Sequence, residues 1–503
     1  MSLLFNIELE ENGRILAGTF NGTLPYSEEV VSVGERDVFI LKMDAALNIE
    51  WIKSLGGKFD EELNEVILVE DHIIVITQYR EEASYDGLVF QDNQGVSTDL
   101  ILKLNMNGEV QLSKQFSANG LQAIEDISWV EEKSAFVITG FFQDSIVLED
   151  NPIYSNGFTD LLIATLDSSF RILNYNHFGQ SGISMSKNVL YYENTFFLGG
   201  SYNDTLSADT FKITANTFDN DLFILKLDSL LQPLWLLKAG GVLEDEWTTM
   251  KMDDAGNIYV GGNIVGVIDI GDDFRLMSQN GNTDLFYFVL DSEGQPLEGA
   301  VFGGVIGDEL SDLLIQENGD IWIAALFQST LDELDIESGG GLASVIFSLK
   351  ASDRSVDQVV NLPTSGAIFA SHIQNTADGE IEVAGSFRGE VEIGGEEIAS
   401  AGFGGFVMSI KEELVNTNAP SLSVAKLKIY PNPAIDQITI EKMDEENGLV
   451  IIDPTGRVIN PSFQPNNQIE LINYPVGCYE VVELNVKGKP VASGSFCIVR
   501  DKK

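Results

Sequence analysis

The chain has 503 residues with 78 acidic and 29 basic side chains, so its formal net charge is −49. This length allows a large core, or two to three domains of roughly 100–200 residues each. The hydrophobic content of 44% is too high for a disordered chain. No stretch approaches the roughly 18 consecutive apolar residues of a membrane-spanning helix. The acidic excess argues against nucleic acid and anionic membrane surfaces as partners, because both carry negative charge.

An apolar segment that begins with an aspartate recurs along most of the chain. Five clear copies, such as DLFILKLD, are followed by two weaker ones. The copies begin at Asp37, Asp99, Asp160, Asp221, Asp284, Ala343 and Gly404. Subtraction of neighbouring positions gives intervals of 59 to 63 residues. The chain therefore contains an internal repeat of about 61 residues.

Two further markers keep the same interval. One is a strand that ends in a small residue, followed two positions later by an aromatic residue in all but one copy. These pairs are Gly18/Phe20, Thr77/Tyr79, Gly140/Phe142, Gly200/Tyr202, Gly262/Ile264, Ala325/Phe327 and Gly385/Phe387. The other marker is an apolar strand that runs into glycines, as in WIKSLGG and LWLLKAGG. Three independent markers with one period establish the repeat.

The repeat unit has the signature of a four-stranded antiparallel meander. Short runs of Val, Ile, Leu, Phe and Tyr alternate with turn sequences such as Asn12-Gly13 and Asp378-Gly379, which supply the positive φ angles of tight hairpins. No amphipathic helix of useful length separates the strands, so a βαβ architecture is excluded. The run from Asp221 is apolar at nearly every position, as in strands that are covered on both faces.

The length of the unit selects one all-β architecture. Tandem immunoglobulin-like domains need on the order of 100 residues each, and parallel β-helices step by roughly 20–30 residues. We therefore predict a seven-bladed β-propeller over residues 1–411, with about 61 residues per blade and an incomplete first blade.

The order of the markers carries a resemblance. An apolar strand with Trp and Gly-Gly precedes the sequence D-x-x-G-N-I-Y-V-x-G and then a strand of the type D-x-F-I-L-K-L-D, with the clearest copy from Pro233 to Asp291. This cycle resembles the SBBP family of bacterial β-propeller repeats across residues 1–411, and most weakly after Gly340. The resemblance implies a propeller outside the cytoplasm. It implies no reaction, because the family motif is structural.

The composition changes after Lys411. Residues 412–425 are polar, contain a proline and lack the repeat markers, so we interpret them as a linker. Residues 426–503 form a different small all-β unit, for which we predict an immunoglobulin-like β-sandwich.

The final unit resembles the type A C-terminal sorting domain of the type IX secretion system. The matching residues are Tyr430, Pro431, Asn432, Pro433, Ile438, Ile440, Asp453, Gly456, Val458, Gly477, Tyr479, Lys502 and Lys503. The resemblance implies Sec-dependent transit through the periplasm, passage through the type IX machinery and cleavage of the tail. The expected location is the medium or the outer-membrane cell surface.

Cargo of this kind needs a signal peptide, and the first residues, MSLLFNIELEENG, show neither a basic n-region nor a cleavage site. The Gly-Gly strand that should precede Gly18 would also fall before Met1. We therefore expect that the chain is an N-terminally truncated or mis-started version of a longer one. The alternative is a propeller that closes with an incomplete blade and is exported unconventionally.

The sequence nominates no catalytic or cofactor-binding residue. His72, His177 and His372 occupy different parts of their repeats and have no metal-ligand spacing, so we interpret all three as structural. Calcium is the one conceivable ion, at Asp253-Asp254 or at Gly271-Asp272-Asp273. Neither site has the twelve-residue loop of an EF-hand, and acidic turns are ordinarily just solvated.

The repeated residues have structural explanations. We expect the aspartates at 37, 99, 160, 221 and 284 to cap tight turns with their side chains. The aromatic residues at 20, 79, 142, 202, 327 and 387 recur once per unit, which is typical of a core between blades and not of a ligand site.

Two functions remain open at this point. The first is a secreted or surface-displayed binding or adhesion module that contacts a glycan, peptide or protein at the propeller axis. The alternative is an extracellular polymer-degrading hydrolase or lyase on the same scaffold. Catalysis would require unusual polar residues in one or two repeats, and the deviant repeats differ only by small or plain residues, so the binding module is favoured. We expect a monomer.

The two cysteines lie in the final unit. If Lys487-Gly488 is a hairpin loop, Cys478 and Cys497 face each other across neighbouring strands, with their Cβ atoms about 4.5–5.5 Å apart. A disulfide is possible at this separation in an oxidising compartment. A pair of free thiols is the alternative.

Overall fold

The computed structural model describes a protein that is almost entirely β. It describes residues 4–8, 13–24, 30–44, 48–92, 97–216, 219–271, 274–279, 281–304, 306–376, 379–393, 396–410, 425–426, 428–430, 437–441, 448–452, 458–459, 463–464, 468–471, 474, 477–484 and 490–498. In these ranges the helical elements are two single 3₁₀ turns, η1 (Glu131–Lys133) and η2 (Asp332–Leu334). None of the helices in the described part of the chain could span a membrane. The predicted all-β class is confirmed.

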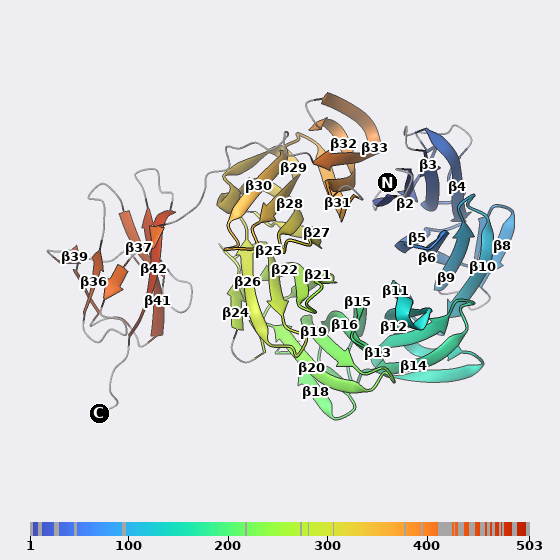
Figure 1. Cartoon of the computed structure of the whole chain (residues 1–503), viewed down its shortest axis with the longest axis horizontal. Coiled ribbons are helices and arrows are strands. Elements are labelled where there is room, and N and C mark those ends of the chain that lie inside the picture. Colours follow the sequence, from blue (N-terminus) through green and yellow to red (C-terminus); the bar gives the residue numbers. More distant parts are fainter. Residues whose placement is uncertain are drawn as a thin grey trace. The chain divides into compact units, whose positions relative to one another are not determined.

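The chain divides into two compact units, Met1–Ala419 and Pro420–Lys503. In the first unit, antiparallel sheets, most of them with four main strands, follow one another along the chain and are arranged around a common centre (Figure 1). The first three sheets comprise β1 (Leu4–Glu8), β2 (Arg14–Phe20), β3 (Asp37–Met43) and β4 (Ile49–Gly57); β5 (Glu62–Val69), β6 (His72–Arg80), β9 (Ser97–Asn105) and β10 (Val110–Ser117); and β11 (Gln122–Val130), β12 (Ala135–Leu148), β13 (Asn151–Asp167) and β14 (Ile172–Phe178).

The later sheets follow the same plan. They comprise β15 (Ser184–Tyr192), β16 (Thr195–Tyr202), β19 (Asp221–Leu227) and β20 (Pro233–Gly240); β21 (Asp245–Met252), β22 (Ile258–Val265), β25 (Thr283–Leu290) and β26 (Pro296–Phe302); β27 (Glu309–Ile315), β28 (Ile321–Leu331), β29 (Ile336–Leu349) and β30 (Val356–Leu362); and β31 (Ala367–Asn375), β32 (Ile381–Ile393) and β33 (Glu396–Ile410). A single parallel bridge, Leu342 to Ala367, joins the last two sheets.

The expectation of an incomplete first sheet is wrong for the described residues. β1 to β4 lie side by side in the first sheet, whereas no described strand of this unit follows β31, β32 and β33. The reason is the position of the sheet boundary, which falls between the Gly-Gly strand and the strand that follows it. Each Gly-Gly strand is the outer strand of its own sheet.

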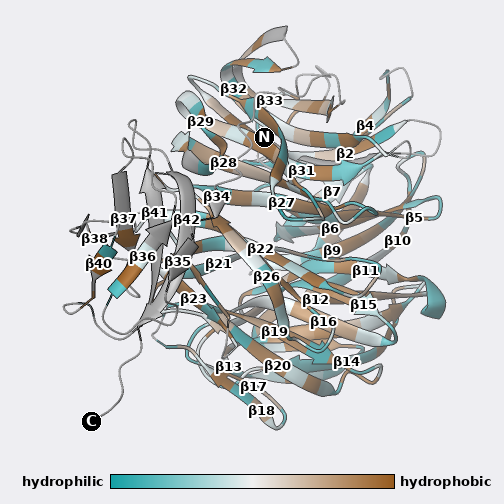
Figure 2. Cartoon of the chain, turned by 60° about the vertical axis from the view of Figure 1, so that its left-hand side comes forward, coloured by the Kyte–Doolittle hydropathy of each residue, from teal (hydrophilic) through white to brown (hydrophobic). Residues whose placement is uncertain are grey.

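The first strand of each sheet is its inner strand. β1, β5, β11, β15, β21, β27 and β31 each contact the next in this order, and β31 also contacts β1. The third strands are buried on both faces, and every residue of β19 is buried. Hydrophobic stretches follow these strands in Figure 2. The six marker aromatics are all at most 6% exposed, which confirms their predicted place in the core.

Short hairpins between the second and third strands were not predicted. We call them arms, because each reaches the outer strand of the preceding sheet. β7 (Glu82–Tyr85) and β8 (Leu88–Gln91) extend β4, and β23 (Val267–Ile270) and β24 (Phe274–Met277) extend β20. β17 (Thr205–Ala208) and β18 (Phe211–Thr214) make one bridge, from Thr205 to Ser181. The arms thereby tie neighbouring sheets together.

The second unit contains two sheets, as the predicted sandwich requires. The first comprises β34 (Ala425–Lys426), β37 (Gly448–Ile452), β38 (Val458–Ile459), β41 (Gly477–Leu484) and β42 (Pro490–Ile498). The second comprises β35 (Lys428–Tyr430), β36 (Gln437–Glu441), β39 (Phe463–Gln464) and β40 (Gln468–Glu470). Both contribute fully buried side chains, among them Ile451 from the first sheet and Ile438 from the second.

Candidate functional site

The inner strands share an irregularity that sets the direction of their side chains. Six of them shift register against the second strand of their sheet, at one extra residue each. The extra residues are Asn64, Glu125, Lys187, Thr248, Ser311 and Ser371. A β-bulge of this kind bends the strand and re-aims the neighbouring side chains.

The small residue of the second strand lies opposite each bulge. At Gly140, Gly200, Gly262 and Gly385, an added Cβ would clash with a carbonyl oxygen of the bulged inner strand. For Gly140 that oxygen belongs to Ala123. The repeated glycine is therefore the sequence mark of the bulge, a connection that the sequence analysis did not make.

The bulges carry polar pairs that differ from repeat to repeat. These pairs are Asn64-Glu65, Glu125-Asp126, Lys187-Asn188, Thr248-Thr249, Ser311-Asp312 and Ser371-His372. Several of their side chains bind the next inner strand. The Asp126 carboxylate accepts the Val189 amide at 2.8 Å, and the Asp312 carboxylate accepts the Ile373 amide at 3.1 Å. The bulges thus join successive inner strands.

Four charged side chains from four inner strands interact electrostatically, and we call them the inner cluster: Glu65, Asp126, Lys251 and Asp312. The Lys251 Nζ lies 3.9 Å from Asp312 Oδ1. The charge of Asp312, followed by those of Glu65 and Asp126, raises the pKa of Lys251 against the effect of burial. The Lys251 side chain is 44% exposed, whereas that of Asp312 is 9% exposed.

Two carboxyl groups of the inner cluster, those of Glu65 and Asp126, ionise less readily than usual. Burial, followed by the charge of Asp126, raises the pKa of Glu65 to about 8. Burial also raises the pKa of Asp126. The cluster therefore offers carboxyl donors, carboxylate acceptors and one ammonium group in one place.

The three histidines lie apart, as predicted. His72 begins β6, and the Nδ1 atom of His177 on β14 lies 2.8 Å from Asp160 Oδ2. His372 follows the bulge of β31 and lies 3.5 Å from Asp312 Oδ2, beside the inner cluster. Its purely structural role stays a prediction.

Of the residues considered for calcium, Asp253 is described by the structure, whereas Asp272 and Asp273 are not. The Asp253 carboxylate caps its own turn, because it accepts the amides of Ala255 and Asn257 at 3.0 and 2.8 Å. Asp272 and Asp273 lie outside the described residues. Glu70, Asp71 and His72 could together face an ion, but they are consecutive and the two acids are exposed.

The repeated aspartates cap turns as predicted in four of the five copies. Asp37, Asp160, Asp221 and Asp284 accept main-chain amides from residues four or five positions earlier. Asp99 accepts the Gln78 amide group at 3.2 Å instead. All five are at most 1% exposed.

The sorting-signal residues are described only in part. Tyr430 ends β35, and Gly477 and Tyr479 lie on β41. Pro431, Asn432, Pro433, Gly456, Lys502 and Lys503 lie outside the described residues. β41 and β42 pair with Cys478 opposite Cys497, which confirms the predicted register, and the disulfide itself stays a prediction.

Comparison with known proteins identifies the second unit. Residues 428–493 match the family described as the secretion system C-terminal sorting domain. This domain directs the chain through the type IX system to the cell surface or the outside, and it implies contact with that machinery. The predicted sorting domain and location are confirmed, whereas the SBBP resemblance stays a prediction.

Solved structures resemble the chain weakly. A fungal alcohol oxidase of the AA5 family, in complex with copper, is 11% identical with a TM-score of 0.35, over 98% of this chain and 95% of that one. PorZ, a surface component of the type IX system of Porphyromonas gingivalis, is 12% identical with a TM-score of 0.26, over 98% and 81%. An acylaminoacyl peptidase of Pyrococcus horikoshii is 10% identical with a TM-score of 0.39, over 89% and 58%. No curated protein matches the sequence.

Proposed function

We propose that the chain is a secreted or surface-displayed binding protein, in which residues 1–411 form a seven-bladed β-propeller and the inner cluster contacts the ligand. The successive contacts of the inner strands, with β31 beside β1, support seven blades around one axis. Residues 412–425 act as a linker, and residues 426–503 act as the sorting domain for export.

The inner cluster is the observation that carries the proposal. Its members come from four repeats and differ in kind, whereas residues that serve only the repeat fold recur in every unit. A position that varies in polarity at the centre of a repetitive scaffold is typical of a ligand site. Three carboxyl groups that interact with one partly exposed lysine suit a polyhydroxylated ligand, such as a glycan, or a basic peptide segment.

A hydrolase or lyase is the second candidate, and one observation favours it. A raised pKa on Glu65, next to the charge of Asp126, is the arrangement that general acid catalysis requires. The inner strands also carry the repeat-to-repeat asymmetry that catalysis needs, which the sequence analysis did not find.

A screen of glycan and basic-peptide arrays with the full-length protein tests the proposal. Binding should be lost in Lys251→Ala and Asp312→Asn and retained in Asp254→Asn, which changes an exposed acid on a turn. Binding that all three variants retain would place the ligand elsewhere. Shortening of the bound glycan would favour the hydrolase or lyase.

A further inference from the structure

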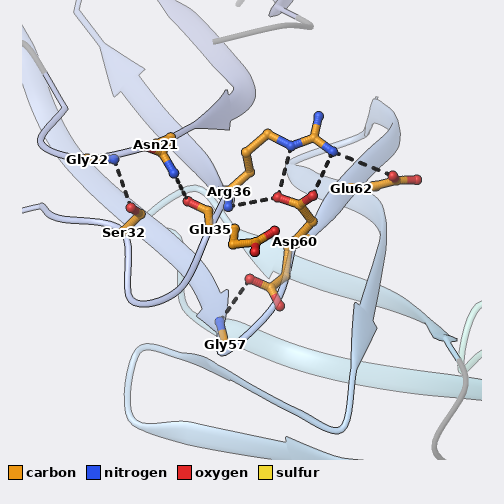
Figure 3. Close-up of polar contacts among 9 residues, drawn as sticks. Asn21, Gly22, Ser32, Glu35, Arg36, Gly57, Asp60 and Glu62 are labelled. Atoms are coloured by element: carbon orange, nitrogen blue, oxygen red, sulfur yellow. Dashed lines mark hydrogen bonds and ion pairs between the residues drawn. The ribbon is translucent and has the colours of Figure 1, made fainter.

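A pair of buried acids, Asp37 and Glu61, lies where the first sheet meets the second. The Glu61 amide donates to the Arg36 carbonyl at 2.8 Å, which holds the two acidic residues side by side. Arg36 also donates hydrogen bonds from its main-chain amide and its guanidinium group to the Asp60 carboxylate, at 3.0–3.1 Å (Figure 3). Both Asp37 and Glu61 are 0% exposed.

Each acid uses only one of its two oxygens. Val33 donates its amide to Asp37 Oδ2 at 3.0 Å, and Gly57 donates its amide to Glu61 Oε2 at 2.8 Å. Asp37 Oδ1 and Glu61 Oε1 are buried and have no hydrogen-bond partner among the described residues. A buried carboxylate oxygen without a donor is costly unless a proton or a cation neutralises it.

Two other repeats place a basic side chain from the outer strand beside the equivalent aspartate. Asp160 has His177 at 2.8 Å, and Asp221 has Lys238 at 2.8 Å. His177 and Lys238 each stand two positions before the glycine at the end of the outer strand, where the first repeat has Ser54.

No basic side chain in the described ranges forms an ion pair with Asp37 or Glu61. The guanidinium group of Arg36 is directed to Asp60 and Glu62 instead. The first repeat therefore has two acids and no internal cation at this position.

We propose that Asp37 and Glu61 together bind a divalent cation, namely Ca²⁺, through their two free oxygens. Hard carboxylate oxygens are the ligands that Ca²⁺ prefers. Its charge would balance both acids at the contact between the first two sheets. Burial raises the pKa of both groups, that of Glu61 to about 8, so a proton shared between the acids is the competing explanation.

Thermal unfolding of the full-length protein in EDTA and in millimolar CaCl₂ tests the proposal. A ligand that binds only the folded state raises the midpoint. Wild type should gain several degrees with CaCl₂, whereas Asp37→Asn and Glu61→Gln should unfold in EDTA no earlier than wild type and gain nothing. The matched control is Asp245→Asn, whose neighbour Asp221 already has Lys238, and it should keep the gain.

Equilibrium dialysis with CaCl₂ provides a second readout, because a chain of charge −49 also attracts cations to its surface. Glu61→Gln should bind one ion fewer than wild type. An equal gain and an equal ion count in all variants would mean surface binding only. If CaCl₂ did not raise the unfolding midpoint of wild type, a proton shared between Asp37 and Glu61 would be the remaining explanation. Either result overturns the proposal.

Discussion

Two adjacent glycines end the outer strand of the fourth repeat, and each is required for a different reason. A Cβ on Gly240 would clash with the buried Asp221 carboxylate. A Cβ on Gly241 would clash with the Val267 carbonyl of the next arm. In this repeat the two glycines are therefore needed because one lies against the repeated aspartate and the other against the arm.

Gly240→Ala should destabilise the protein, since the clash involves a fully buried side chain. Overpacking of this kind costs about 1–3 kcal/mol or more. Gly307→Ala is the matched control, because its Cβ would meet its nearest neighbour at 3.5 Å, an ordinary contact. Denaturant unfolding monitored by tryptophan fluorescence measures both, and equal stability of the two variants would contradict this explanation.

The buried acids make stability depend on pH. Burial raises the pKa of Asp245 to about 8, above the value of about 3.9 in an unfolded chain. The folded state therefore holds the proton more tightly, so this contribution to stability is complete below pH about 4 and is lost as the pH rises towards 8.

We expect the unfolding midpoint in EDTA to fall between pH 5 and pH 8.5, and to fall less in Asp245→Asn. Asp254→Asn, at an exposed turn position, should follow wild type. A midpoint that rises over this range, or that falls equally in Asp245→Asn, would show that the Asp245 carboxyl is not held in its neutral form.

At the scale of elements, the long apolar strands were predictable, whereas the bulges and the arms that connect neighbouring sheets were not. A run such as DLFILKL of β19 is apolar at five of its seven positions, which predicts a strand covered on both faces, and all seven residues are buried. The bulges escaped prediction because an extra residue does not change the hydrophobic pattern enough. The arms escaped because strands of only four residues, such as β23, are too short to show a clear alternating pattern.

The arm β23–β24 should nevertheless contribute to the core. Ile268 and Ile270 are 0% exposed and pack in one cluster with Trp247. Ile268→Ala should cost about 2–5 kcal/mol of unfolding free energy. Arg275→Ala on the same arm removes a largely exposed ion pair with Asp269 and should cost no more than about 1 kcal/mol. Denaturant unfolding measures both variants. Similar small losses of unfolding free energy in the two would mean that the arm does not contribute to the core.

At the scale of the whole molecule, export was the most predictable property and the ligand site the least. The sorting signal is a local motif that keeps its order and spacing in the chain. The inner cluster is assembled from residues 61, 125 and 61 positions apart along the chain, and none of the four stands out within its own strand.

The two units should separate functionally. Deletion of residues 426–503 from the exported precursor should leave a folded first unit that stays in the periplasm, since the tail carries the sorting signal. Cell fractionation and protease resistance measure this result, and a reporter fused before residues 412–503 and behind a signal peptide should reach the surface or medium. Normal surface levels of the truncated protein would contradict the role of the tail.

The central claim is that the displayed chain holds its ligand at the inner cluster. The most direct measurement is the binding of the labelled array ligand to intact cells that produce wild type, Lys251→Ala or Asp312→Asn. We predict equal amounts of each protein at the surface, with ligand bound by wild type and by neither variant. Undiminished binding by the variants at equal surface amounts would contradict the account.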